Sequence, residues 1–140
     1  MLMRVMGLDL GTVTCGIALS DPMGIVARAV ETVRFDSEDY EMALDKVTEV
    51  IKREQPGKIV LGYPKHMNGD IGIRAQASEQ FKAMLEERTG LDVELWDERL
   101  TTVAAERILI QADVSRKKRK KIIDQMAAVQ ILQSWLDAHS

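Results

Sequence analysis

The chain has little cysteine, few aromatic residues and no long apolar run. Its single cysteine, Cys15, cannot form an internal disulfide, which fits a reducing cytoplasm. Aromatic residues make up only 4% of the chain, so a binding surface built mainly on base stacking is not expected. No apolar stretch approaches the ~18 residues of a membrane span, and the N-terminal segment reaches Asp9 too early for a signal peptide. These features predict a cytoplasmic protein with no membrane partner.

Positive charge is concentrated at one place. The formal net charge is −3. However, six cations follow one another without a break: Arg116, Lys117, Lys118, Arg119, Lys120 and Lys121. A basic patch on an acidic body is typical of a nucleic-acid-binding surface. A solvated helix start or a basic loop would give the same pattern.

The 140 residues suit a single domain, 1–140, and the hydropathy pattern predicts its elements. Apolar and alternating segments predict strands over 3–10, 15–20, 25–34, 58–62 and 91–96. Helical spacing predicts helices over 38–54, 72–88, 101–112 and 120–138, with Asp36 or Ser37 capping the first. This order predicts an α/β fold with a mixed five-stranded sheet, an antiparallel meander of three strands plus two parallel strands, and helices on both faces.

Three acidic positions are candidates for chemistry. Asp9 lies near the end of the first predicted strand, where an unpaired carboxylate among apolar residues is costly to bury. Asp97 and Glu98 follow the fifth strand, and ligands bind at strand ends in open α/β sheets. Asp124 heads an apolar stripe on the last helix. That stripe contains Asp124, Ala128, Ile131 and Trp135. Simpler explanations are a turn cap at Asp9, a charged loop after the fifth strand, and a favourable helix dipole at Asp124.

Carboxylates from these three places, if they converge, form an oxygen-ligand set of the kind that Mg²⁺ and Mn²⁺ prefer. Two such ions ~4 Å apart can position water and stabilise the leaving oxygen in phosphodiester cleavage. Cys15, His66 and His139 are too few and too scattered for a zinc site. Lys65, in the turn-rich loop after the fourth strand, is a candidate phosphate contact, although the loop would also serve as a plain connection.

Four motifs, in order along nearly the whole chain, resemble the YqgF family, also called RuvX. The first is D-x-G-x-x-x-x-G, at Asp9, Gly11 and Gly16. The second is G-x-P-x-x-x-x-G, at Gly62, Pro64 and Gly69. The third is D-E-R-x-T, at Asp97, Glu98, Arg99 and Thr101. The basic run and I-D-x-x-A-A, at Ile123, Asp124, Ala127 and Ala128, complete the set. Together they are specific, whereas any one alone would be weak.

The resemblance implies a ribonuclease H-like fold and nuclease activity. Asp9, Glu98 and Asp124 would be catalytic ligands of Mg²⁺ or Mn²⁺, with Asp97 as the alternative to Glu98. Lys65, Arg99 and the basic run would bind nucleic-acid phosphates. Two roles are assigned to family members: processing the 5′ end of precursor 16S rRNA, and cutting Holliday junctions, which are branched DNA. A symmetric cut of a junction calls for a homodimer, whereas trimming one RNA end needs only a monomer.

Two other functions remain open from the sequence. A non-catalytic nucleic-acid-binding factor in ribosome assembly would use the basic run equally well. An actin-like ATP-binding module is suggested by the similarity of Asp9–Thr12 to a phosphate motif of those proteins, but such modules need two domains around the nucleotide.

Overall fold

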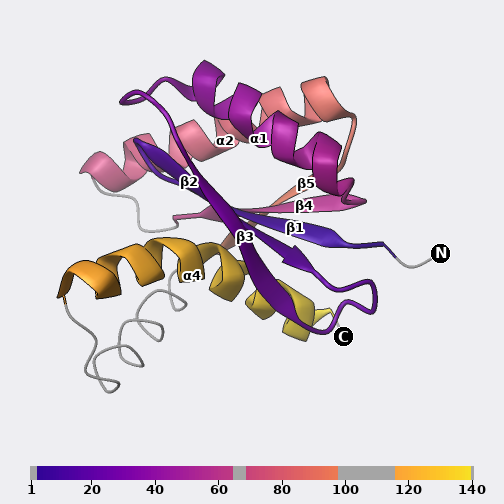
Figure 1. Cartoon of the computed structure of the whole chain (residues 1–140). Coiled ribbons are helices and arrows are strands. Elements are labelled where there is room, and N and C mark those ends of the chain that lie inside the picture. Colours follow the sequence, from indigo (N-terminus) through magenta and orange to yellow (C-terminus); the bar gives the residue numbers. More distant parts are fainter. Residues whose placement is uncertain (1–2, 65–68, 98–115, 140) are drawn as a thin grey trace.

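In the computed structural model, which describes residues 3–64, 69–97 and 116–139, one sheet lies between two layers of helices (Figure 1). The strands are β1 (Val5–Leu10), β2 (Thr14–Ser20), β3 (Ala27–Arg34), β4 (Lys58–Tyr63) and β5 (Val93–Asp97). The helices are α1 (Tyr40–Glu54), α2 (Gly69–Thr89) and α4 (Arg116–Ala138). The five predicted strands are confirmed to within about three residues at each end. The helix predicted over 101–112 lies outside the described residues.

The strand order is β3-β2-β1-β4-β5. β1, β2 and β3 pair antiparallel, whereas β4 pairs parallel with both β1 and β5. This is the predicted sheet of a three-stranded meander plus two parallel strands. The parallel arrangement brings the carboxyl ends of β1, β4 and β5 to one edge of the sheet, and such an edge is where α/β sheets bind ligands.

Alternation along β1 sorts its side chains between the two helical layers. Met6, Leu8 and Leu10 pack into the core beneath α1 and α2. Val5 belongs to a second cluster with residues of α4, so Gly7 and Asp9 share its side of the sheet. We call these two sides the α1/α2 face and the α4 face. Figure 1 shows α1 and α2 on one side of the sheet and α4 on the other.

A β-bulge in the edge strand β3 changes which face its residues serve. Ala18 pairs with Ala29 and Ile17 pairs with Glu31, so Val30 is an extra residue on β3. Ala27 therefore belongs to the α4 face, whereas Val33 packs into the α1/α2 core. One additional residue thus shifts the two-residue period of the strand, as a bulge requires.

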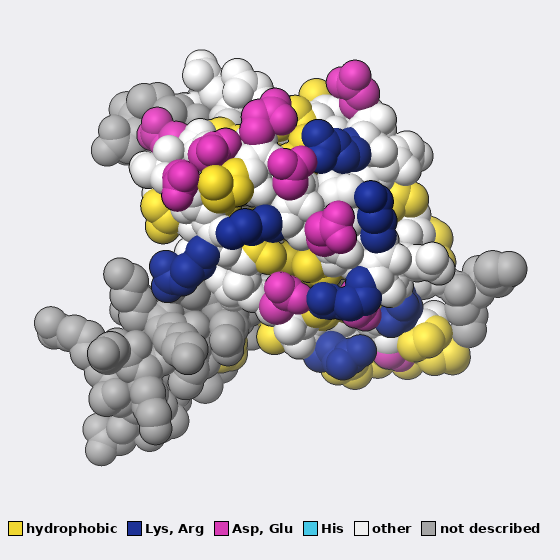
Figure 2. Space-filling model, turned by 45° about the horizontal axis from the view of Figure 1, so that its top comes forward, with side chains coloured by type: hydrophobic (Ala, Val, Ile, Leu, Met, Phe, Trp, Pro, Cys, Tyr) yellow, Lys and Arg dark blue, Asp and Glu magenta, His cyan; other side chains and the backbone are white. Residues whose placement is uncertain are grey.

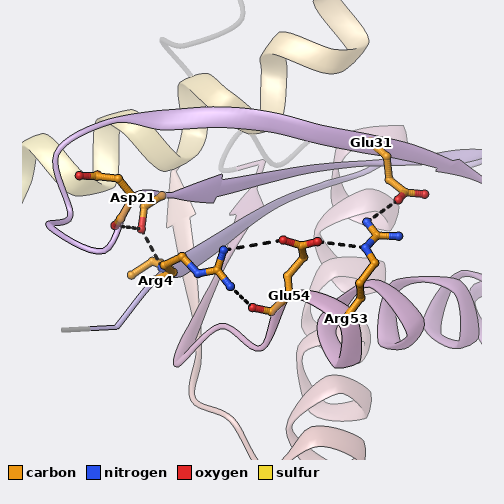
Figure 3. A network of polar contacts seen from close by, with 7 residues as sticks. Arg4, Asp21, Glu31, Arg53 and Glu54 are labelled. Carbon is orange, nitrogen blue, oxygen red and sulfur yellow. Dashed lines mark hydrogen bonds and ion pairs between the residues drawn. The ribbon is translucent and has the colours of Figure 1, made fainter. Parts of the chain in front are cut away.

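The ends of α1 are fixed by polar contacts. Asp39 is the N-cap and accepts a hydrogen bond from the Met42 amide at 3.1 Å. The predicted caps Asp36 and Ser37 are therefore wrong, because an additional turn precedes the helix. At the other end, Arg53 and Glu54 enter an ion-pair network (Figure 3). It links Arg4, before β1, to Glu54, then Glu54 to Arg53, and Arg53 to Glu31 of β3.

The two longest of the described helices, α2 with 21 residues and α4 with 23, have charged residues along their sequences. Among the described helices, none combines the length and the apolar character that crossing a membrane requires.

Ser20, at the end of β2, is a buried polar residue whose loss we expect to destabilise the fold. Its hydroxyl accepts a hydrogen bond from the Val5 amide at 2.8 Å and donates one to the Asp21 carbonyl at 3.1 Å. Ser20→Ala leaves a buried amide without this partner, so the free energy of unfolding should fall by about 1–3 kcal/mol. Urea unfolding measures the change. The exposed Ser37→Ala is the control, and an equal loss in both variants would contradict the role given to Ser20.

Candidate active site at the carboxyl edge of the sheet

Asp9 and Asp97 both lie at the carboxyl edge, on strands that flank β4. Asp9 is the penultimate residue of β1, and Asp97 is the last residue of β5 rather than the first residue after it. Leu8 pairs with Leu61, and Tyr63 pairs with Asp97. The two carboxylates are therefore close to the same edge, as the sequence predicts.

The two carboxylates lie on opposite faces of the sheet. Asp9, which is partly exposed, continues the α4 face of β1. Side chains two residues apart on a strand face the same side, so Asp97 shares the face of Val93 and Leu95, which pack into the α1/α2 core. Its neighbour on β4, Tyr63, also points that way, since the Tyr63 hydroxyl donates to Glu79 of α2 at 2.7 Å. Strand geometry thus separates Asp97 from Asp9. Glu98, the other candidate, lies outside the described residues.

Helix α4 covers the face of the sheet on which Asp9 lies. Its buried residues Ala128, Ile131, Leu132 and Leu136 pack with Val5 and Val60 of the sheet. The predicted stripe is thus confirmed at Ala128 and Ile131. Trp135 is only partly buried, and its indole nitrogen donates to Glu94 at 3.1 Å.

The direction of α4 carries its N-terminal half toward the carboxyl end of β1. Near the helix end, Leu136 clusters with Val5 at the start of β1. Farther back, Leu132 and Ala128 lie against Gly7 in the middle of the strand. The helix therefore runs antiparallel to β1. Position 124 lies one helical turn before Ala128, and therefore farther toward the end of β1 that carries Asp9. The side chain of Asp124 is outside the described residues.

The basic run is part of α4 rather than the linker before it. The sequence pattern predicts the last helix from residue 120, but the helix begins at Arg116. Its first turn contains no acidic residue. The sequence pattern begins the helix late because it relies on apolar spacing, which a run of six charged residues lacks.

Cys15 lies next to the candidate site and is fully buried. It pairs with Leu10 across the β1–β2 ladder. Burial raises the pKa of the Cys15 thiol, and the nearby charge of Asp9 raises it further. The side chain is therefore a neutral thiol in the core.

The other predicted site residues cannot be placed together. Lys65, Glu98 and Arg99 lie outside the described residues. The basic run is described only in its backbone. Within the side chains that the structure does describe, no three carboxylate, histidine or cysteine groups gather as a metal site would require. Asp9 is the only one of the three predicted catalytic ligands whose side chain is described.

Among the described residues, the molecular surface over α1 has no cluster of positive charge (Figure 2). Figure 2 shows cations and carboxylates intermixed there. Several are paired with each other, as Arg53 is with Glu31 and Arg88 with Asp45. Such a surface gives little net attraction for a polyanion.

The fold is similar to that of two resolvases of known structure. One is RuvC of T. thermophilus in complex with a Holliday junction substrate, with a TM-score of 0.65 and 14% identity over 98% of this chain and 96% of that one. The other is the Fowlpox virus resolvase in complex with Holliday junction DNA, with a TM-score of 0.57 and 11% identity over 98% and 99% of the two chains. These similarities confirm the ribonuclease H-like fold.

Proteins of similar sequence match nearly the whole chain. A protein of Geobacillus sp. (strain WCH70), named "Putative pre-16S rRNA nuclease", is 56% identical over 136 residues, covering 97% of this chain and 99% of its own. One of Listeria monocytogenes serotype 4b (strain CLIP80459), with the same name, is 55% identical over 135 residues, covering 96% and 98%. The family described as "RuvX: Holliday junction resolvase" matches residues 3–138. The resemblance seen in the motifs is therefore confirmed, and the chain belongs to the RuvX family.

Proposed function

We propose that this protein is a divalent-metal-dependent nuclease that hydrolyses phosphodiester bonds in precursor rRNA or branched DNA. The observation that carries the proposal is the position of Asp9. It lies at the carboxyl edge of the sheet, on the face that α4 covers, and α4 brings position 124 toward it. Membership of the RuvX family and the names of its relatives support this function.

The donor set fits Mg²⁺ or Mn²⁺. We assign Asp9, Glu98 and Asp124 as ligands, because carboxylate oxygens suit these hard cations. The strand alternation supports Glu98 over Asp97, since Asp97 continues the face opposite to Asp9. When bound, the ions would orient the attacking water and stabilise the charge that develops on the leaving oxygen. The role of the carboxylates is to bind the metal ions, and none of them forms a covalent bond to the substrate.

The cationic residues bind the substrate. We assign Lys65, Arg99 and the basic run, residues 116–121, to contacts with backbone phosphates. Such contacts position nucleic acid without reading its sequence. The run opens α4 directly before position 124. A phosphate held by the run would therefore lie close to the proposed ligands.

A cleavage assay that compares two substrates tests the proposal and identifies the substrate. A precursor 16S rRNA fragment and a synthetic four-way DNA junction are each incubated with the protein in Mg²⁺, in Mn²⁺ and in EDTA. We expect cleavage of at least one substrate in the presence of metal and none in EDTA. Binding to both substrates without cleavage in either metal would contradict the nuclease assignment and favour a non-catalytic assembly factor.

A further inference from the structure

The backbone of α4 rests directly on β1 at Gly7. A Cβ atom built on this glycine would lie 2.7 Å from the Cβ of Leu132 and 3.1 Å from the carbonyl oxygen of Ala128. Carbon atoms of side chains normally stay about 3.5–4.0 Å apart. The strand cannot move aside, because Gly7 is paired with Ala18 on one side and Val60 on the other. Any side chain at position 7 must therefore displace the helix.

Polar contacts fix α4 at Gln133 and Ser134, directly after Leu132. The Gln133 side chain accepts from the amide of Ala27, the first residue of β3, at 2.9 Å and donates to the carbonyl of Ile25, just before the strand, at 2.8 Å. Ser134 accepts from the indole nitrogen of Trp96 on β5 at 3.2 Å. These contacts attach the C-terminal half of the helix to both edge strands. A side chain at position 7 would then tilt the N-terminal half away from the sheet rather than rotate the helix.

We propose that Gly7 is a positioning residue that sets the separation between Asp9 and position 124. The inference rests on the proposed function, since it takes Asp9 and Asp124 as ligands. Gly7 precedes Asp9 by two residues on the same face, and Ala128 follows position 124 by one turn. The close contact therefore lies near Asp9 on the strand and near position 124 on the helix.

The expected displacement is large enough to matter. Restoring a normal carbon–carbon separation at Leu132 requires a shift of about 1 Å. Position 124 lies farther than Leu132 from the contacts of Gln133 and Ser134, so a tilt about those contacts moves it by more. Functional constellations must be held within about 0.5 Å of their working geometry. The displacement caused by a single methyl group at position 7 is thus larger than the metal site tolerates.

The test compares Gly7→Ala with Leu136→Ala. Both changes disturb the cluster between α4 and the sheet, but Leu136 lies at the end of the helix away from Asp9. Mn²⁺ affinity is measured by calorimetric titration, and single-turnover cleavage is measured at limiting and saturating Mn²⁺, at a temperature where circular dichroism shows both variants folded. We expect Gly7→Ala to lose at least about 10-fold in Mn²⁺ affinity. Its cleavage rate should partly recover at saturating Mn²⁺, whereas Leu136→Ala stays within about twofold of the parent protein in both measurements.

Leu132→Ile is a second variant for the case in which Gly7→Ala does not fold. It conserves volume, which cores tolerate well, but adds a branch at the Cβ that faces Gly7, so it should also weaken Mn²⁺ binding. Mn²⁺ affinity equal to that of Leu136→Ala in the folded variants would overturn the role of Gly7 while the nuclease assignment stands. A parent protein that neither binds Mn²⁺ nor cleaves would overturn the nuclease assignment, and the positioning role with it.

Discussion

Asp9→Asn is expected to lower the rate of phosphodiester cleavage by at least about 100-fold in saturating Mg²⁺ or Mn²⁺. The substitution keeps the size of the side chain but replaces an anionic oxygen ligand by a neutral amide, which hard divalent cations bind poorly. Asp124→Asn should have a loss of the same order. Single-turnover cleavage of the better of the two substrates gives the comparison directly.

Asp45→Asn is the matched control for the loss of one carboxylate. Asp45 is exposed on α1, on the opposite face of the sheet, where it pairs with Arg88 at 2.6 Å. Its substitution should leave the cleavage rate within about twofold of the parent protein. Undiminished cleavage by Asp9→Asn or by Asp124→Asn would refute the proposed set of metal ligands.

Neutralising the basic run should weaken nucleic-acid binding and its dependence on salt. A variant with glutamine at Lys117, Lys118, Lys120 and Lys121 removes four positive charges at the start of α4. Each lost phosphate contact reduces the slope of log K against log salt by about 0.9 for duplex DNA. The slope should therefore become shallower by up to about 3–4, with an affinity loss of about 100-fold or more at low salt. Fluorescence anisotropy between 50 and 200 mM salt measures both quantities.

Four cations of β3 and α1 provide the control for total charge: Arg28, Arg34, Lys46 and Lys52. Changing them to glutamine removes the same formal charge from surfaces away from the proposed site. Their loss should alter affinity by a small, uniform amount and leave the slope nearly unchanged. Equal slopes in the two variants would show that the run makes no phosphate contacts of its own.

The sheet could be predicted from the sequence because its signals are local. Continuous apolar segments at β1 and β4, and the turn residues between β1 and β2, determine strands whose order follows from short connections. The alternation along β3 is less regular because Val30 is an extra residue at the bulge. Residues an even number of positions apart on either side of it therefore face opposite sides of the sheet. Periodicity alone does not show where such an extra residue lies.

The candidate site could be predicted only in part, because it depends on long-range placement. The strand-end position of Asp9 follows from the sequence. The separation of Asp97 from Asp9 needs the register, which shows that Asp97 continues the face of Val93 and Leu95. Gly7 had a usable signal, since glycine inside a strand often marks a close approach of another backbone. The identity of that backbone, α4, comes from residues more than a hundred positions away.

The bulge also bears on how the folded protein behaves at high concentration. A regular, flat outer strand would offer its unpaired amides and carbonyls as a template on which a strand of another molecule could add. In β3 the additional residue Val30 interrupts that row of groups. Arg28 and Glu31 place exposed charges on either side of it. This border of the sheet is thereby protected against strand-by-strand aggregation, and the same residue that sends Val33 into the core helps to keep separate molecules apart.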